Sequence, residues 1–108
     1  MDISKKQFKI VFTNDCKQEM DNIYNYISNN LYAPKAAKEL MNKVETTVQS
    51  LKDMPEAYMT IKKYSELEME YRRIVINNYV IIYTISKEKN SIYIVHMYYG
   101  GSNYFKYI

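Results

Sequence analysis

The last third of the chain places the strongest constraint on its fold. Residues 71–99 read YRRIVINNYVIIYTISKEKNSIYIVHMYY, in which β-branched and aromatic residues form three runs separated by short polar breaks. Such runs are typical of β-strands, and the breaks are typical of turns. We therefore predict strands over 71–76, 79–85 and 91–99. Because consecutive strands with short connections pair with one another, the three should form an antiparallel meander.

The beginning of the chain predicts one strand followed by a helix. Residues 7–13 alternate apolar and polar side chains, which favours a short strand. Over 15–30 the apolar residues recur every three to four positions, as in an amphipathic helix. Asn14 and Asp15 are the candidate N-caps, because their side-chain oxygens can accept amide hydrogens of the first turn.

A second helix is expected to begin near Pro34, which suits a first helical turn, and to end before Pro55. The span 56–70 is polar and is left as a connection without assigned structure. The predicted class is therefore α+β, in one domain over 1–108. It consists of an N-terminal strand, an antiparallel helical hairpin and a three-stranded antiparallel meander packed against the helices.

The composition of the chain excludes several classes of protein. A chain of 108 residues with a net charge of +3 fits one small domain. One cysteine rules out an intramolecular disulfide and a multi-cysteine zinc site, and no apolar run is long enough to cross a membrane. We expect a cytoplasmic protein. A Ser-His-Asp set, a Gly-rich phosphate loop, HExxH and CxxC are all absent, which argues against the usual hydrolase families.

The two arginines of the chain, Arg72 and Arg73, are adjacent. Neighbouring side chains on a strand point to opposite faces, so one can face the helices while the other projects toward a ligand. A guanidinium suits phosphate or carboxylate recognition. For either arginine, the structural alternative is a salt bridge with Glu66, Glu68 or Glu70.

The single histidine, His96, could act as a general acid or base, although a hydrogen-bonded structural role is the more common one. It has no neighbouring ligands for a metal, and we expect neither a metal nor a cofactor. Tyr98, Tyr99, Tyr104 and Tyr107 gather near the C-terminus. They could stack on bases or pack on the sheet.

The order of strand, helical hairpin, polar connection and meander resembles the RelE/ParE superfamily of type II toxin–antitoxin toxins over roughly residues 7–104. The resemblance rests on the segments FKIVFTNDCKQEMDNIYNYI, APKAAKELMNKVETTVQSLKDMP and, most strongly, YRRIVINNYVIIYTI followed by IYIVHMYYG. The features closer to the ParE than to the RelE branch are Tyr26-Ile27, Pro34, Ala36-Ala37 and Leu51 followed by Pro55.

The resemblance implies one of two activities. RelE-like members are ribosome-dependent messenger RNA endonucleases that rely on basic residues and a C-terminal tyrosine or histidine rather than a metal. ParE-like members generally lack this basic set and poison DNA gyrase. In this sequence Arg72 matches the arginine that usually opens the second strand, and Tyr104 falls where a late tyrosine often occurs.

The sequence departs from the family after the last strand. Where the family often has Gly-Arg-Arg-Asp-Tyr, this chain has Gly100, Gly101, Ser102, Asn103 and Tyr104. A ribonuclease needs cations to stabilise the charge of a cleaved phosphate. The absence of both arginines therefore disfavours RNA cleavage, and it also leaves open a weakened or inactive toxin.

The resemblance thus implies a toxin associated with growth inhibition and plasmid stabilization. It would inhibit DNA gyrase by protein binding and be neutralised by a cognate antitoxin in a hetero-oligomer, with no membrane partner. The expected functional surface is the open face of the meander, with one of Arg72 or Arg73 and residues 98–104. The candidate target-binding residues are Arg72, Arg73, Tyr98, Tyr99 and Tyr104.

Two alternatives stay open. In the first, the toxin cleaves messenger RNA on the ribosome without a metal. Arg72 or Arg73 would then bind phosphate, His96 would act as acid or base, and Tyr104 would stack on a base or handle a proton. In the second, the chain is an inactive binding module that retains only the antitoxin interface.

Overall fold

The computed structural model describes residues 7–64 and 69–101. Its elements follow one another as β1 (Lys9–Phe12), α1 (Asn14–Asn25), a π-helical turn η1 (Tyr26–Asn30), α2 (Pro34–Ser50), β2 (Thr60–Tyr64), β3 (Met69–Ile76), β4 (Tyr79–Ser86) and β5 (Ser91–Tyr99).

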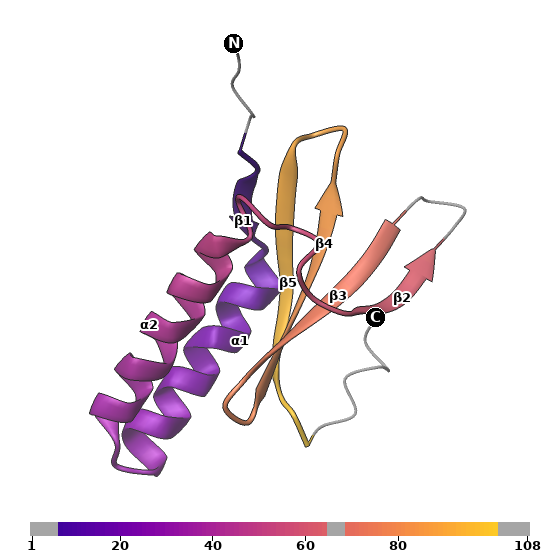
Figure 1. The fold of residues 1–108 in the computed structure, drawn as a ribbon. Helices are drawn as coiled ribbons and strands as arrows, with labels where there is room; N and C mark the ends of the chain where they lie inside the picture. Colours follow the sequence, from indigo (N-terminus) through magenta and orange to yellow (C-terminus); the bar gives the residue numbers. More distant parts are fainter. Residues whose placement is uncertain (1–6, 65–68, 102–108) are drawn as a thin grey trace.

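The strands form one sheet in the order β1-β5-β4-β3-β2. β1 runs parallel to β5, and the other neighbours are antiparallel. The helices α1 and α2 lie side by side against one face of this sheet (Figure 1). The predicted α+β class, with its helical hairpin and packed meander, is confirmed.

The meander has one strand more than the sequence predicted. β2 lies within the span 56–70, for which the sequence predicts only a polar connection, and it pairs with β3. Its sequence, TIKKY, has too few apolar residues for a recognisable alternation, and its register shifts between Thr60 and Lys62. Pairing with β3, rather than its own composition, makes this segment a strand.

The core lies between the two helices and the sheet. Every second residue of the central strands points toward the helices, as the pleat requires. The buried residues that form this core are Cys16, Ile27, Ala37, Leu40, Val44, Val48, Leu51, Ile74, Ile76, Ile81, Tyr83, Ile92, Ile94 and Met97.

The first helix is capped by Thr13, so the prediction of Asn14 or Asp15 as the N-cap was wrong. The Thr13 hydroxyl accepts a hydrogen bond from the Cys16 amide at 3.1 Å and donates one to the Val95 carbonyl at 3.1 Å. Thr13 is the N-cap because the end of β1 holds it beside β5, where its hydroxyl can bond both the first turn of α1 and the backbone of β5.

Replacing Thr13 with alanine should lower the free energy of unfolding by about 1–2 kcal/mol, because the cap and the contact with β5 are lost together. Urea denaturation followed by circular dichroism measures this change. Thr13→Ser keeps the hydroxyl and is the matched control. Equal stability of the alanine and serine variants would contradict this role.

The helix predicted over 15–30 changes geometry before its end. α1 stops at Asn25, and η1 continues with wider π-type turns until Asn30. Tyr32 then takes a positive φ of 52°, and Pro34 occupies the first turn of α2 as predicted. The reversal between the helices is thus compressed into very few residues.

Two local features of the sheet set the register of β3, β4 and β5. The β3–β4 turn consists of Asn77 and Asn78, and Asn77 has the positive φ (54°) that a primed hairpin turn requires. In β5, the partners of β4 shift from Ile94 to His96, which leaves Val95 as an extra, bulged residue. Before this bulge the even-numbered residues Ile92 and Ile94 face the helices. After it, the odd-numbered Met97 faces the helices and the even-numbered residues face away from them.

Candidate functional site

The two arginines lie on opposite faces of β3, as the alternation predicted. Arg72 shares a face with the core residues Ile74 and Ile76 and is only 9% exposed. Arg73 shares the other face with Tyr71, which packs on Val80 and Ile82, away from the helices. We call this second surface the open face. It is formed by the outward side chains of β3, β4 and β5.

Arg72 fastens the loop between α2 and β2. Its guanidinium donates to the Tyr58 carbonyl at 2.6 Å and to the Glu56 carbonyl at 3.4 Å. It also pairs with the carboxylates of Glu70 at 3.3 Å and Glu56 at 3.7 Å. Its Nε is buried without a partner. The salt-bridge alternative is confirmed for Arg72 through Glu70, whereas Glu66 and Glu68 lie outside the described residues.

Tyr83 holds the same loop from the neighbouring strand. It is the cross-strand partner of Arg72, is fully buried, and donates its hydroxyl to the Pro55 carbonyl at 2.7 Å. Burial raises the pKa of Tyr83 to about 12, although the positive charge of Arg72 acts in the opposite direction. Arg72 and Tyr83 thus hold the loop between α2 and β2 through three of its backbone carbonyls, those of residues 55, 56 and 58.

His96 is held by a carboxylate from α1. Its Nδ1 lies 3.1 Å from both oxygens of Glu19, and Glu19 also accepts the Met97 amide at 3.1 Å. The ring stacks on Tyr98, with centroids 4.9 Å apart and planes inclined by 20°. Because a carboxylate accepts hydrogen bonds, Nδ1 carries the proton, and in a neutral ring Nε2 is the acceptor.

The role of Glu19 was not predicted. It is separated from His96 by 77 residues, so no local pattern connects the two. The sequence shows only that Glu19 directly precedes Met20 of the apolar stripe of the predicted helix, and the partial burial of Glu19 is seen in the structure alone. Its pairing with β5 is a consequence of tertiary packing.

The bulge at Val95 aligns two of the predicted site residues. Arg73 pairs with Ile82, and Ile82 pairs with His96, so the three lie in one row across the open face. Two strand spacings, roughly 10 Å, separate the backbones of Arg73 and His96. The Arg73 guanidinium lies 4.0 Å from the Met59 Sδ, on the β2 side of β3 and therefore away from His96.

The predicted tyrosines are distributed over both faces. Tyr98 packs on the open face, against the pair formed by Val80 and Ile82. Tyr99 is 58% exposed and meets Tyr79 edge-on, with centroids 5.9 Å apart. The structure thus places Arg73, His96 and Tyr98 on the open face, where His96 stacks on Tyr98, and it places Arg72 and Tyr99 elsewhere.

Tyr104 lies outside the described residues, as do Ser102, Asn103 and Tyr107. The part that each predicted residue plays in target binding stays a prediction.

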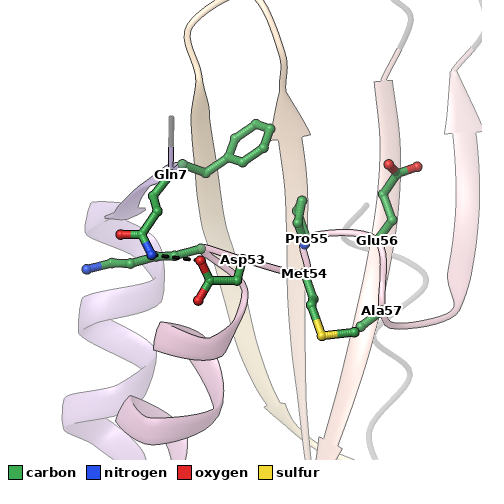
Figure 2. Close-up of a pocket in the computed structure, with 8 residues that line it drawn as sticks. Gln7, Asp53, Met54, Pro55, Glu56 and Ala57 are labelled. Carbon is green, nitrogen blue, oxygen red and sulfur yellow. Dashed lines mark hydrogen bonds between the residues drawn. The ribbon is translucent and has the colours of Figure 1, made fainter. Parts of the chain in front are cut away.

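A pocket of about 540 Å³ lies between the residues that precede β1 and the loop that leaves α2. Figure 2 shows Gln7 and Asp53 joined across it by a 2.7 Å hydrogen bond, with Met54, Pro55, Glu56 and Ala57 following along the loop. The pocket also includes Lys52, so its charges are mixed. No cluster of three potential metal ligands occurs in the described part of the chain.

The described helices include none long and apolar enough to cross a membrane. No match was found among curated proteins. In fold, the chain is similar to the chromosomal ParDE toxin–antitoxin system from P. aeruginosa, with 15% identity over 84% of this chain and 94% of that chain and a TM-score of 0.66. It is also similar to the archaeal RelE-RelB complex from Pyrococcus horikoshii OT3, with 13% identity over 88% of this chain and 97% of that chain and a TM-score of 0.59.

These two likenesses concern the fold alone. The sequence itself matches the family described as the ParE toxin of the type II toxin-antitoxin system, parDE, over residues 10–104. This match spans all the described elements except the first residue of β1, and it agrees with the order of the elements. The chain belongs to the ParE toxin family and is the toxin component of a type II toxin–antitoxin system.

Proposed function

We propose that this toxin inhibits DNA gyrase by binding it through the open face of the sheet, and that a cognate antitoxin neutralises it in a hetero-oligomer. Membership in the ParE family supports the choice of gyrase. Both gyrase and the ribosome act in the cytoplasm, which is therefore the proposed site of action.

The observation that carries this proposal is the chemistry of the open face. Among the described side chains of β3, β4 and β5, those on this face are mainly apolar and aromatic. They include Tyr71, Arg73, Val75, Val80, Ile82, Thr84, Tyr93, Val95, His96 and Tyr98. Tyrosine and arginine are enriched in the energetically dominant positions of protein interfaces. Binding to a nucleic acid strand instead draws on many phosphate contacts from cations.

Replacing Arg73 with alanine should raise the concentration of toxin needed for half-inhibition of gyrase supercoiling at least tenfold, because an interfacial arginine commonly contributes more than about 1.4 kcal/mol. Lys87→Ala is the matched control, since Lys87 is exposed in the turn at the opposite end of β4. If the Arg73 variant inhibits as well as the unmodified toxin, the open face is not the gyrase surface.

A second candidate function is cleavage of messenger RNA on the ribosome. The specific observation in its favour is the row of Arg73 and His96, in which Glu19 orients the imidazole much as the acidic member of a catalytic triad does. Mapping of messenger RNA ends in a translating extract tests it. Cuts in the ribosomal A site that disappear in His96→Gln, with gyrase unaffected, would replace the gyrase proposal.

The third alternative, an inactive module, has its own simple test. Induced expression of the toxin without its antitoxin should stop growth under either active mechanism. Unchanged growth at a confirmed level of folded protein would favour a chain that keeps only the antitoxin interface.

A further inference from the structure

The turn between η1 and α2 contains a backbone conformation that its side chain does not favour. Three described residues other than glycine have a positive φ, and two of them are asparagines, Asn77 and Asn90, a residue type that tolerates this conformation. The third is Tyr32, with a φ of 52°. A left-handed conformation is unfavourable for a bulky residue because its Cβ approaches the following carbonyl oxygen. The turn therefore carries local strain at Tyr32.

Packing of the Tyr32 side chain does not offset this strain. The side chain is 88% exposed, and its ring contacts no other ring in the described part of the chain. Leu31, next to it, is 54% exposed. The turn lies at the lower end of the two helices in Figure 1, and it presents these two large apolar side chains to solvent. Strained residues of this kind cluster where a protein binds or acts on a partner.

The backbone on both sides of Tyr32 is held by the fold. The Leu31 amide donates to the Tyr26 carbonyl at 3.1 Å, and the Ala33 amide donates to the Ile27 carbonyl at 3.0 Å. A side chain on a fixed backbone loses less conformational entropy on binding than one on a mobile loop. Leu31 and Tyr32 are therefore preorganised for contact with a partner.

The charge around the turn is positive. From residue 22 to residue 38 the sequence has no aspartate or glutamate, and it has two lysines, Lys35 and Lys38. Both are exposed in the first turns of α2, and neither forms an ion pair with a described residue. We call Leu31, Tyr32, Lys35 and Lys38 the hairpin tip. A complementary surface combines an apolar side chain with negative charges.

This combination favours a protein partner. A second copy of the chain would bring like charges together in the same contact. Single-stranded nucleic acid is held by a groove of cations along several phosphates, and two lysines beside a leucine do not form such a groove. A segment that carries carboxylates and an aliphatic or aromatic side chain matches both parts of the hairpin tip.

We propose that the hairpin tip docks an acidic segment of a protein partner, which packs an apolar side chain on Leu31 and Tyr32 and places carboxylates on Lys35 and Lys38. The hairpin tip belongs to the helical layer, and the open face lies on the other side of the sheet. It is therefore a surface separate from the proposed gyrase site, and its test uses neither gyrase nor the ribosome.

Amide NMR signals of the full chain, titrated with three probes, test this docking. The first probe is the acetylated tetrapeptide amide Glu-Leu-Phe-Glu, the second is its uncharged counterpart Gln-Leu-Phe-Gln, and the third is a six-nucleotide oligothymidylate. The acidic peptide should shift the signals of Leu31, Tyr32 and Lys35 in a saturable manner. The uncharged peptide should bind at least fivefold more weakly, and the oligonucleotide should not displace the acidic peptide. Added salt should weaken binding of the acidic peptide only.

Two variants assign the charge. The double variant Lys35→Gln/Lys38→Gln should weaken binding of the acidic peptide at least fivefold, whereas Lys17→Gln, in the first half of α1, should leave it unchanged. Equal binding of the two peptides, tighter binding of the oligonucleotide, or saturable shifts located elsewhere would each overturn the proposal, as would the absence of shifts.

A third variant separates a binding role of Tyr32 from a structural one. Tyr32→Asn should raise Tm by about 4 °C, because asparagine tolerates a positive φ, and it should weaken binding of the acidic peptide at least threefold. Tyr24→Asn is the matched control, since Tyr24 is an exposed tyrosine in the regular part of α1, and it should neither raise Tm nor weaken binding. A lower Tm for Tyr32→Asn would show that the ring stabilises the turn, and unchanged binding would show that the ring does not contact the peptide. Either result would overturn the proposal.

Discussion

Replacing Arg72 with alanine is expected to lower the free energy of unfolding by about 3 kcal/mol, since a largely buried charge and its hydrogen bonds are removed together. The carbonyls of Glu56 and Tyr58 would lose their donor, and the loop over the sheet would lose its anchor. The partly exposed side chains of Glu56 and Glu70 can be rehydrated, which keeps the loss toward the lower end of the range for buried pairs.

The neighbouring arginine provides the control. Arg73→Ala should change the stability by less than about 1 kcal/mol, because Arg73 lies on the open face and not beneath the loop. Urea denaturation of the two variants measures the difference directly. Arg72→Lys should fall between them, since an ammonium keeps the charge but cannot donate in a planar fork. Equal stabilities for the two alanine variants would mean that the hydrogen bonds of Arg72 to the loop do not stabilise the fold.

A loss of about 2 kcal/mol is expected between pH 10 and pH 12 from the ionisation of Tyr83. Its pKa is about 12 in the folded chain and 10 when unperturbed, so the unfolded state releases the proton first. The stabilisation is therefore complete below pH 10 and is lost as the pH rises through 12.

Tyr83→Phe isolates this effect, because the other tyrosines titrate in both proteins. At neutral pH the variant should be less stable by about 1 kcal/mol, since the Pro55 carbonyl loses its donor. The deficit should shrink and then reverse as denaturation curves are repeated at increasing pH. A deficit that stays constant up to pH 12 would show that Tyr83 ionises equally in both states.

Much of the fold could be predicted from the sequence, because its signals are local. The three strand runs, the Asn77-Asn78 turn and Pro34 at the start of α2 follow from side-chain alternation and backbone preference. β2 could not be predicted in this way, since its residues become a strand only beside β3. The cap at Thr13 likewise depends on the position of β5.

The site was predictable only in part. Strand alternation required Arg72 and Arg73 to face opposite ways, but it did not show which of them faces the helices. That assignment depends on the carbonyls of a loop distant in sequence. The alignment of Arg73 with His96 depends on the bulge at Val95, and a single extra residue leaves no clear trace in the pattern of side chains.

The contact of Glu19 with the Met97 amide also limits how other chains can join the sheet. β1 ends at Phe12, and beyond it Thr13 and Glu19 engage the Val95 carbonyl and the Met97 amide of β5. Those backbone groups would otherwise be a template for strand addition. Among the described strands, a partner that extends this sheet must therefore approach along β1 or β2, and α1 keeps a second copy of the toxin from pairing directly with the end of β5.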